Sequence, residues 1–307
     1  MLGYVTDATA LAGIVRRELP EPQPGAHDVV IEVAAYSINR GELALIEDRT
    51  DGWTPGQDVA GVVAVSAEDG TGPAAGTRVV GLADQGGWGE RVIVPSHRVA
   101  ALPDSVAFTE AAALPVAGLT ALRGLRTGGS LLNRSVLITG ASGGVGTFAV
   151  QLARTGGALV TAQVSGPARI AAVSALGASE VITDIGADAG PFHLVLDGVG
   201  GKVLSAAVRR LATGGVATAY GVASGQRSDI AFYDFAAGAP GARLEGFFVY
   251  RTGEETFGQD LATLALLVAE GKLTPQIGAP RDWNSTPAEV MALRRREATG
   301  KLVLVRN

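Results

Sequence analysis

Residues 140–146, GASGGVG, lie between an apolar run at 135–139 and a segment with helical spacing. Small residues at a strand-to-helix turn let backbone amides approach a diphosphate, and the helix N-terminus adds about half a unit of positive charge. In the dinucleotide-binding spacing GxGxxG, the first position is Ala141, the second is Gly143 and the third is Gly146. The order of strand, loop and helix predicts a dinucleotide site rather than a tight turn alone.

The end of the next strand, about 20 residues beyond the glycines, selects between the two nicotinamide cofactors. Residues 163–169 read Gln-Val-Ser-Gly-Pro-Ala-Arg and contain no carboxylate that could bind the two ribose hydroxyls. Ser165 and Arg169 offer instead the hydroxyl and the cation that a 2′-phosphate requires. We therefore expect NADPH. In the alternative interpretation, Ser165 caps the following helix and Arg169 is a solvated surface charge.

The elements that would hold these residues alternate between strand and helix from residue 135 onward. Short apolar runs are typical of buried parallel strands, and segments with helical spacing separate them. The expected strands are 136–139, 159–163, 180–183, 194–196 and 216–220, and the expected helices are 144–154, 167–176 and 202–211. This alternation predicts an α/β fold with a doubly wound parallel sheet.

The segments before and after this region have a different pattern. From Val29 to Ala101, alternating apolar residues and turn signals such as Asp69-Gly70 predict a mainly antiparallel sheet or barrel. After residue 246 we expect a strand over 247–250, an amphipathic helix near 260–270 and a closing strand over 301–305.

Composition argues against several function classes. The net charge of -5 includes no basic block, so nucleic acid is not an expected partner. No apolar run approaches the ~18 residues of a membrane helix, and no signal sequence is apparent, so we expect no membrane association and a cytoplasmic location. The 307 residues include no Cys, and His27, His97 and His193 stand far apart, so we expect no metal site.

Several segments together carry a resemblance to a known family. They are 35–42 (AYSINRGE), 55–63 (PGQDVAGVV), 113–120 (ALPVAGLT), 140–146, 196–201 (LDGVGG) and 300–304 (GKLVL). In this order the chain resembles the medium-chain dehydrogenase/reductase superfamily, specifically its zinc-independent quinone oxidoreductase (zeta-crystallin-like) branch. The resemblance covers nearly the whole chain. It implies a Rossmann dinucleotide-binding domain over 109–248 and a GroES-like, mainly antiparallel β catalytic domain over 1–108 and 249–307.

The resemblance also has implications for metal and substrate. Zinc-dependent alcohol dehydrogenases of the same superfamily place metal ligands where this sequence has Asn39, Gln57 and Val116, none of which is a usual zinc ligand. The resemblance therefore implies reduction without a Lewis-acid metal. Quinones and α,β-unsaturated carbonyls suit such a reaction, because their conjugation spreads the added charge onto a distant oxygen.

Carried over residue by residue, the resemblance implies a set of cofactor contacts. Asn39 and Thr120 would lie near the nicotinamide. The other predicted cofactor-binding residues are in the glycine loop, at strand ends or near the carboxamide: Ser142, Gly143, Gly144, Val145, Ser165, Arg169, Gly198, Val199, Gly221, Phe247 and Phe248. The sequence departs from the family pattern at Glu42, where Asp is frequent, and around Asp184, where a tyrosine commonly helps to hold the 2′-phosphate.

Asn39 and Tyr36 are the candidate catalytic residues, because both lie in the first matching motif. Tyr36 fits equally well as a packed strand residue, and Asn39 as a structural hydrogen-bonding residue. The sequence names no proton donor, and solvent could protonate the product.

These observations predict an NADPH-dependent reductase that transfers hydride to a quinone or an α,β-unsaturated carbonyl in the cleft between the two domains. Two alternatives stay open: an enoyl or enone reductase of a biosynthetic pathway, and a non-catalytic NADPH-binding module. By resemblance alone, we also expect a homodimer formed through edge strands of the cofactor domain.

Overall fold

The computed structural model describes residues 1–236, 239–298 and 300–306, and the chain forms two compact units. The first unit comprises Met1–Leu119 and Gly253–Asn307, and the second comprises Thr120–Thr252. Residues 109–119 therefore belong to the first unit, although the sequence analysis assigned them to the cofactor domain.

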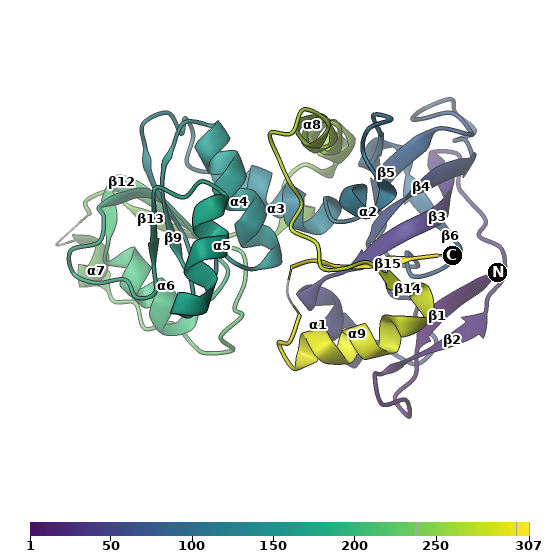
Figure 1. The fold of residues 1–307 in the computed structure, drawn as a ribbon, viewed down its shortest axis with the longest axis horizontal. Helices are drawn as coiled ribbons and strands as arrows, with labels where there is room; N and C mark the ends of the chain where they lie inside the picture. Colours follow the sequence, from purple (N-terminus) through teal and green to yellow (C-terminus); the bar gives the residue numbers. More distant parts are fainter. Residues whose placement is uncertain (237–238, 299, 307) are drawn as a thin grey trace. The chain divides into compact units, whose positions relative to one another are not determined.

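In the described part of the second unit, six strands form one parallel sheet (Figure 1). They are β8 (Ser135–Ile138), β9 (Leu159–Gln163), β10 (Glu180–Ile182), β11 (Phe192–Asp197), β12 (Leu211–Ala219) and β13 (Arg243–Gly246). Their order across the sheet is β10-β9-β8-β11-β12-β13. The predicted doubly wound α/β fold is confirmed, with the strand order reversing direction between β8 and β11.

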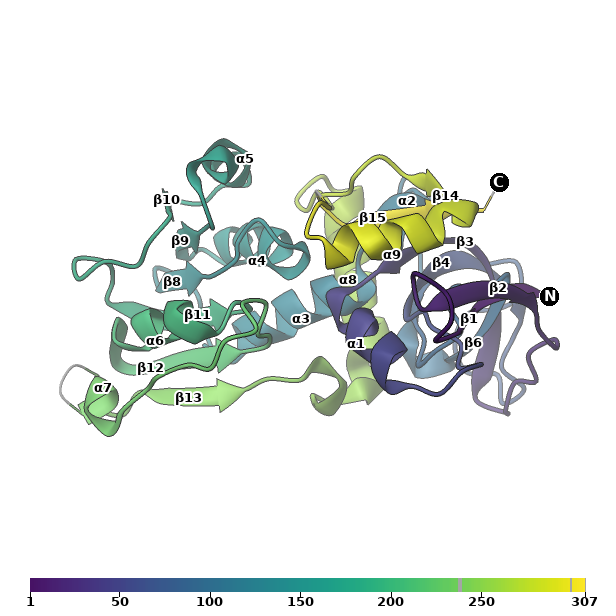
Figure 2. The same ribbon diagram turned by 90° about the horizontal axis from the view of Figure 1, so that it is seen from below.

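The helices of the second unit pack on this sheet. They are α4 (Gly144–Thr155), α5 (Ile170–Ala175), α6 (Gly201–Val208), α7 (Phe232–Ala236) and the latter part of α3 (Pro115–Arg126). Helix α4 contacts β8 and β9, whereas α6 contacts β11 and β12 (Figure 2). Because crossover connections are right-handed, the reversal at β8 places α4 and α6 on opposite faces of the sheet.

Two predicted element boundaries in this unit are wrong. The strand expected over 247–250 lies earlier, at β13, and residues 249–251 form a 3₁₀ turn. The apolar pattern missed β13 because the side chains of Arg243 and Leu244 are exposed on an edge strand. The helix expected over 202–211 ends at Val208, because Leu211 already begins β12.

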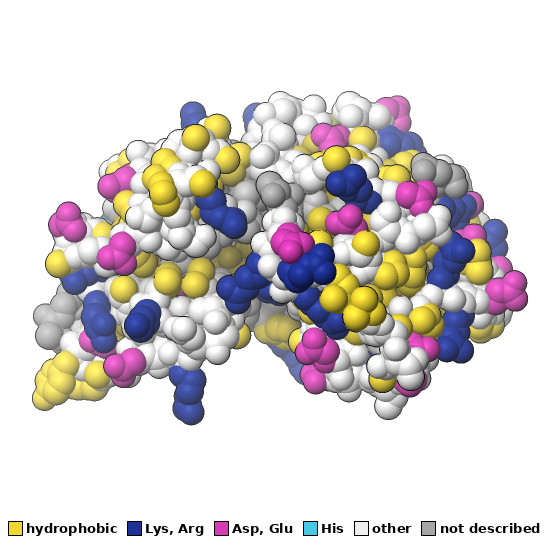
Figure 3. All heavy atoms as spheres, turned by 60° about the horizontal axis from the view of Figure 1, so that its bottom comes forward, with side chains coloured by type: hydrophobic (Ala, Val, Ile, Leu, Met, Phe, Trp, Pro, Cys, Tyr) yellow, Lys and Arg dark blue, Asp and Glu magenta, His cyan; other side chains and the backbone are white. Residues whose placement is uncertain are grey.

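Apolar side chains are exposed at the end of this unit that carries α7 (Figure 3). Phe232 and Tyr233 are 76% and 75% exposed, and their ring centroids are 5.5 Å apart. Of the aromatic residues of α7, only Phe235 packs against the core.

The first unit contains a mainly antiparallel sheet, as the sequence predicts. Its strands run in the order β14-β15-β3-β4-β5-β7, with β6 also paired to β3, and β1 and β2 form a separate hairpin. They are β1 (Leu2–Thr6), β2 (Ile14–Glu18), β3 (Asp28–Ile38), β4 (Asp58–Val65), β5 (Arg78–Leu82), β6 (Arg91–Pro95), β7 (Val99–Ala101), β14 (Arg281–Asp282) and β15 (Leu302–Val305). Strand β15, from the end of the chain, pairs antiparallel with β3.

The helices of the first unit are α1 (Arg40–Asp48), α2 (Phe108–Ala111), α8 (Phe257–Ala269) and α9 (Thr286–Arg294). Helix α2 contacts β3, β4 and β15, which explains why residues just after 108 belong to this unit. Helix α8 covers β5 and β7 and matches the predicted amphipathic helix. In the described ranges, no helix is long and apolar enough to cross a membrane.

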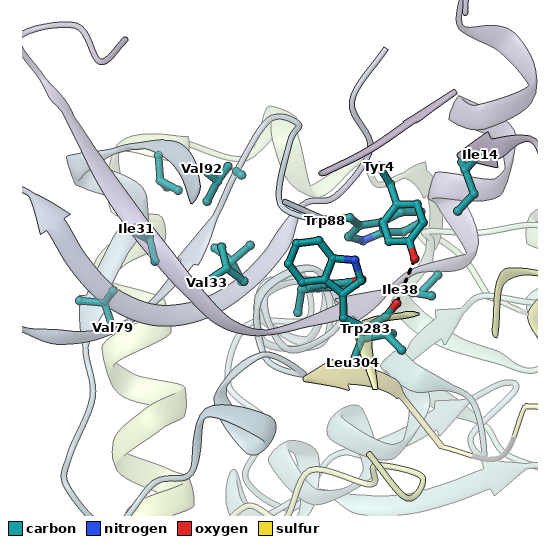
Figure 4. Packing of buried hydrophobic residues seen from close by; sticks show 14 of the residues in the cluster. Tyr4, Ile14, Ile31, Val33, Ile38, Val79, Trp88, Val92, Trp283 and Leu304 are labelled. Atoms are coloured by element: carbon teal, nitrogen blue, oxygen red, sulfur yellow. Dashed lines mark hydrogen bonds between the residues drawn. The ribbon is translucent and has the colours of Figure 1, made fainter. Parts of the chain in front are cut away.

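Aromatic side chains from both ends of the chain form the centre of the first unit (Figure 4). The rings of Tyr36 and Trp88 stack with centroids 6.1 Å apart, and Trp283 lies edge-on to Tyr36 at 6.5 Å. The Tyr4 hydroxyl donates to the Trp283 carbonyl at 3.1 Å. Burial of these rings joins the N-terminal hairpin, β3 and the segment before α9 into one core.

Gly61 in β4 allows a close approach of β4 to β3. A Cβ added at Gly61 would lie 2.0 Å from the Glu32 carbonyl oxygen, which is backbone and has little freedom to move. We expect Gly61→Ala to lower the free energy of unfolding by about 2–3 kcal/mol, because the two strands must separate.

Urea denaturation of the purified chain measures this effect. Gly246→Ala is the matched control, because a Cβ there meets no heavy atom within 4 Å, and its stability should change by less than about 0.5 kcal/mol. Equal unfolding midpoints for the two variants would contradict the proposed close approach.

Candidate functional site

The glycine loop occupies the turn between β8 and α4. Gly140 has a positive φ of 56°, and the Gly143 amide donates to the Gly140 carbonyl at 2.9 Å. A Cβ at Gly146 would lie 2.5 Å from the Gly140 carbonyl oxygen, so only glycine fits at this point of α4. The loop is thus a tight turn that brings Ser142, Gly143, Gly144 and Val145 to the start of α4.

The start of α4 has the properties of an anion site. Gly143 is the N-cap residue, no side chain caps the helix, and the first turn contains no acidic residue. The N–H groups in the first turn of this 12-residue helix are therefore available to a ligand, at the positive end of the helix dipole. This geometry fits the diphosphate of a dinucleotide.

The end of β9 is joined to the glycine loop by hydrogen bonds from both backbone and side chain. Ala141 donates its amide to the Gln163 carbonyl at 2.9 Å, and Gly140 donates to Gln163 Oε1 at 3.2 Å. Beyond this strand, Arg169 Nη1 donates to Ser142 Oγ at 3.0 Å. The guanidinium and the loop that would hold the diphosphate are therefore neighbours, and Arg169 is exposed to solvent.

Ser165 is exposed in the same turn, and it does not cap the following 3₁₀ turn, whose N-cap is Gly166. The capping alternative for Ser165 is therefore wrong. Asp184, which follows β10, is also exposed.

The ends of β8 and β11 are joined by a buried hydrogen-bond network where the strand order reverses. Thr139 Oγ1 donates to Asp197 Oδ1 at 2.5 Å, and the Gly200 amide donates to Asp197 Oδ2 at 2.9 Å. Burial raises the pKa of the Asp197 carboxyl, and the hydrogen bonds from Thr139 and the backbone oppose this shift. The network fixes the loop that carries the predicted residues Gly198 and Val199.

Gly221, Phe247 and Phe248 follow the carboxyl ends of β12 and β13. A Cβ at Gly221 would lie 3.1 Å from the Gly198 carbonyl oxygen, so the loops after β11 and β12 approach closely. The Phe247 amide donates to the Ala219 carbonyl at 2.8 Å, and the next residue, Phe248, is 61% exposed. Thr120 is buried on α3.

In the first unit, the side chain of Asn39 is held at both ends of its amide. Nδ2 donates to Asp58 Oδ2 at 2.8 Å, and Oδ1 accepts from Lys301 Nζ at 2.5 Å. Lys301 Nζ also lies 2.9 Å from Asp58 Oδ2, and the two side chains are 5% and 0% exposed. The orientation of the Asn39 amide is therefore fixed by a buried ion pair.

Asp58 connects further elements to this ion pair. It accepts from Ser37 Oγ at 2.6 Å at the end of β3 and from the Val116 amide at 2.8 Å at the start of α3. A carboxylate at the N-terminus of a helix interacts favourably with the helix dipole. Asp58 thus fixes the beginning of α3.

Glu42 is a second buried carboxyl beside this pair. Its two carboxyl oxygens accept hydrogen bonds from the backbone amide of Asn39 at 2.6 Å and from the backbone amide of Gln57 at 2.9 Å. Burial, with a smaller effect of the Asp58 charge, raises the pKa of Glu42 to about 8. Burial thus opposes ionisation of Glu42, whereas Asp58 has Lys301 as its counter-charge.

The residues at the positions of the zinc ligands in related dehydrogenases do not fit a zinc ion. Val116 has no donor atom in its side chain, and both ends of the Asn39 amide already have partners. Within the described residues, no group of three or more His, Cys, Asp or Glu side chains could hold a metal ion.

Tyr36 lies in the core, 1% exposed, with its hydroxyl 2.6 Å from Thr286 Oγ1. Burial raises the pKa of this phenol well above its ordinary value. This environment supports the packing alternative for Tyr36, so we leave it out of the proposed site.

The sequence patterns did not indicate the buried polar residues that position the site: Ser37, Asp58, Thr139, Asp197 and Lys301. One signal was available, because Asp58, Asp197 and Lys301 are charged residues at the ends of apolar strand runs. A charge in such a position requires a partner when it is buried.

Two family models match successive parts of the chain. Residues 25–104 match the alcohol dehydrogenase GroES-like domain, and residues 144–266 match the zinc-binding dehydrogenase family. The second match extends beyond residue 252 into the first unit.

The curated relatives of the chain include proteins with more than 30% identity to it. A spectinabilin polyketide synthase system protein of Streptomyces orinoci is 37% identical over 92% of this chain and 13% of its own length. A chloroplast envelope quinone oxidoreductase homolog of Arabidopsis thaliana is 35% identical over 59% of this chain and 60% of its own. A trans-enoyl reductase of Aspergillus flavipes is 37% identical over 53% of each chain. The matches thus span less than two thirds of the length of each relative.

Solved structures resemble the chain over nearly its full length. A mycobacterial quinone oxidoreductase has a TM-score of 0.87 and 26% identity, covering 99% of this chain and 98% of its own. A mycobacterial protein solved in complex with NADPH has a TM-score of 0.84 and 25% identity, with the same coverage of both chains. Together with the two-unit fold, the two family models show that the chain belongs to the medium-chain dehydrogenase/reductase superfamily of oxidoreductases, in which it is similar to quinone oxidoreductases and to trans-enoyl reductases.

Proposed function

We propose that this chain is an NADPH-dependent reductase that transfers hydride to a quinone or an α,β-unsaturated carbonyl compound. The observation that carries the cofactor assignment is the contact of Arg169 with Ser142 in the glycine loop. A bound nicotinamide would supply the hydride, and the chain's own residues would bind and orient the reactants.

Charge at the end of β9 supports NADPH over NADH. No carboxylate stands within residues 163–169, so the ribose hydroxyls of NADH lack their usual acceptor. Arg169 offers a guanidinium and Ser165 an exposed hydroxyl to a 2′-phosphate. A mycobacterial structural relative has been solved with NADPH, which agrees with this assignment.

Asn39 is the residue of the first unit that we propose for contact with the cofactor. Because Lys301 and Asp58 hold its amide, Asn39 can present one remaining N–H and one remaining lone pair in a fixed direction. A neutral amide in this setting orients a ligand and does not supply a proton. Protonation of the product is accordingly assigned to solvent.

An enoyl or enone reductase is the second candidate, because relatives of similar identity are named trans-enoyl reductases. Both candidates use the same hydride geometry and differ only in the acceptor. The third candidate, a non-catalytic NADPH-binding module, shares the cofactor site and predicts binding without turnover.

The edge strand β13 supports the expected homodimer. In the described part of the sheet, β13 has a neighbouring strand on one side only, and Leu244 in it is partly exposed. Unpaired backbone groups on such an edge can pair with the same strand of a second copy.

Oxidation of NADPH, followed at 340 nm, tests the proposed function. We expect the purified chain, treated with a chelator, to oxidise NADPH when a simple quinone or a medium-chain enone is added, and the faster acceptor distinguishes the first two candidates. Reactions without acceptor are the control. Tight NADPH binding without turnover on either acceptor would support the binding module and contradict the reductase.

Arg169→Ala tests the assignment of the 2′-phosphate. Loss of one charge-assisted hydrogen bond should raise the Kd for NADPH about 10-fold and leave the Kd for NADH unchanged. Arg134→Ala is the matched control, because Arg134 is exposed just before β8, at the opposite end of the strands. An equal loss of affinity for both cofactors would show that Arg169 does not contact the 2′-phosphate.

Lys301→Met tests the ion pair that holds Asn39. The substitution leaves the buried Asp58 carboxylate without its counter-charge, so we expect the free energy of unfolding to fall by about 3–5 kcal/mol. Adding Asp58→Asn removes the stranded charge and should recover part of this loss, measured by urea denaturation of both variants. A double variant no more stable than Lys301→Met would contradict the coupling.

A further inference from the structure

Tyr220 follows β12 directly and lies at the carboxyl end of the parallel sheet. Its amide donates to the Asp197 carbonyl at 2.8 Å, which ties it to the end of β11. The following loop is tied in the same way, because Ala223 donates to the Gly198 carbonyl at 3.0 Å and Ser224 to the Val199 carbonyl at 2.9 Å. The backbone around Tyr220 is therefore fixed to the loop after β11.

The phenol ring of Tyr220 lies directly over Gly198. A Cβ at Gly198 would be 2.4 Å from the Tyr220 hydroxyl oxygen and 2.5 Å from the ring carbon that bears it. Any residue other than glycine would displace the phenol. The structure thus gives Gly198 a second role, which is to make room for the Tyr220 side chain.

The Tyr220 hydroxyl has no hydrogen-bond partner among residues 1–236, 239–298 and 300–306. The nearby Asp197 carboxylate is already bonded to Thr139 Oγ1 and to the Gly200 amide. Tyr220 is half-buried and its hydroxyl is not sealed from the surface, so the hydroxyl can donate to an external acceptor.

The hydroxyl is a donor in this environment. Burial raises the pKa of the Tyr220 phenol, and the Asp197 charge raises it further, so the group stays protonated in the physiological range. A neutral phenol donates one hydrogen bond and is a poor source of a transferable proton.

The position of Tyr220 points to the ligand. Val199, next to Gly198, reaches the glycine loop: a Cβ at Gly140 would lie 3.0 Å from Val199 Cγ2. Tyr220 therefore lies at the same edge of the sheet as the loop that would hold the diphosphate. It belongs to the half built from β11, β12 and β13, and in doubly wound folds the two halves each bind one mononucleotide.

We propose that the Tyr220 hydroxyl donates a hydrogen bond to an oxygen of the nicotinamide mononucleotide half of the bound dinucleotide. The proposal rests on the proposed function in one respect, namely that the chain binds a nicotinamide dinucleotide. It adds a binding residue that the motifs did not indicate. Tyr220 acts through affinity and orientation, and it takes no part in proton transfer.

Tyr220→Phe removes only the hydroxyl oxygen and no hydrogen bond within the described chain. Loss of one hydrogen bond should weaken NADPH binding about 3- to 10-fold, measured by calorimetry or by nicotinamide fluorescence. The affinity for 2′,5′-ADP, which lacks the nicotinamide half, should stay unchanged. Tyr233→Phe is the matched control, because its hydroxyl belongs to a 75% exposed side chain on α7.

The outcomes separate this proposal from the proposed function. If the unmodified chain binds NADPH and Tyr220→Phe binds it equally well, the role of Tyr220 is wrong while cofactor binding stands. An equal loss of affinity for 2′,5′-ADP, or a fall in the melting temperature, would show a structural role instead and overturn the proposal. If the unmodified chain binds no nicotinamide dinucleotide, the proposed function and this proposal both fail.

Discussion

The buried ion pair between Lys301 and Asp58 is the constraint on which the first unit depends. Removing two charges from water is costly, and the cost is offset only where geometry and additional hydrogen bonds are favourable. Here Ser37, Asn39 and the Val116 amide complete the coordination of the Asp58 carboxylate. One carboxylate therefore joins the end of β3, the start of β4, the start of α3 and the residue before β15.

The second unit uses the same physical solution at a different place. Thr139 donates a hydrogen bond to Asp197 at the ends of β8 and β11, the neighbouring strands between which the strand order reverses. The carboxylate also holds the Gly200 amide, and the adjoining backbone holds Tyr220. A polar pair at the strand ends thus fixes the loops that the ligand would meet, while the apolar side chains between them form the core.

The fold was largely predictable from the sequence because each of its signals is local. Apolar runs separated by helical spacing predicted β8, β9, β11 and α4, and the small residues of 140–146 predicted the turn between strand and helix. Strand β13 was missed because an exposed edge strand carries no apolar alternation. The local pattern thus failed where burial did not control the choice of residue.

The site was less predictable because its organisation depends on contacts between distant residues. Lys301 and Asp58 are 243 positions apart, so no spacing rule connects them. The motif around Asn39 was visible, but the two partners that fix its amide became apparent only in the folded chain. Tyr36, three residues earlier, has the chemistry of a catalytic residue, yet its strand turns that side chain into the aromatic core.

The first unit is built from both ends of the chain, and this limits the order in which the two units can fold. All residues of the second unit are continuous in sequence, so they can pair as soon as Thr252 has been made. The first unit must wait for β15 and Lys301, because residues 35–38 of β3 lack their β15 partner and Asp58 lacks its counter-charge until then. During synthesis, the unit that begins first is therefore the one that is completed last, and its long-range contacts make that final step the slow one.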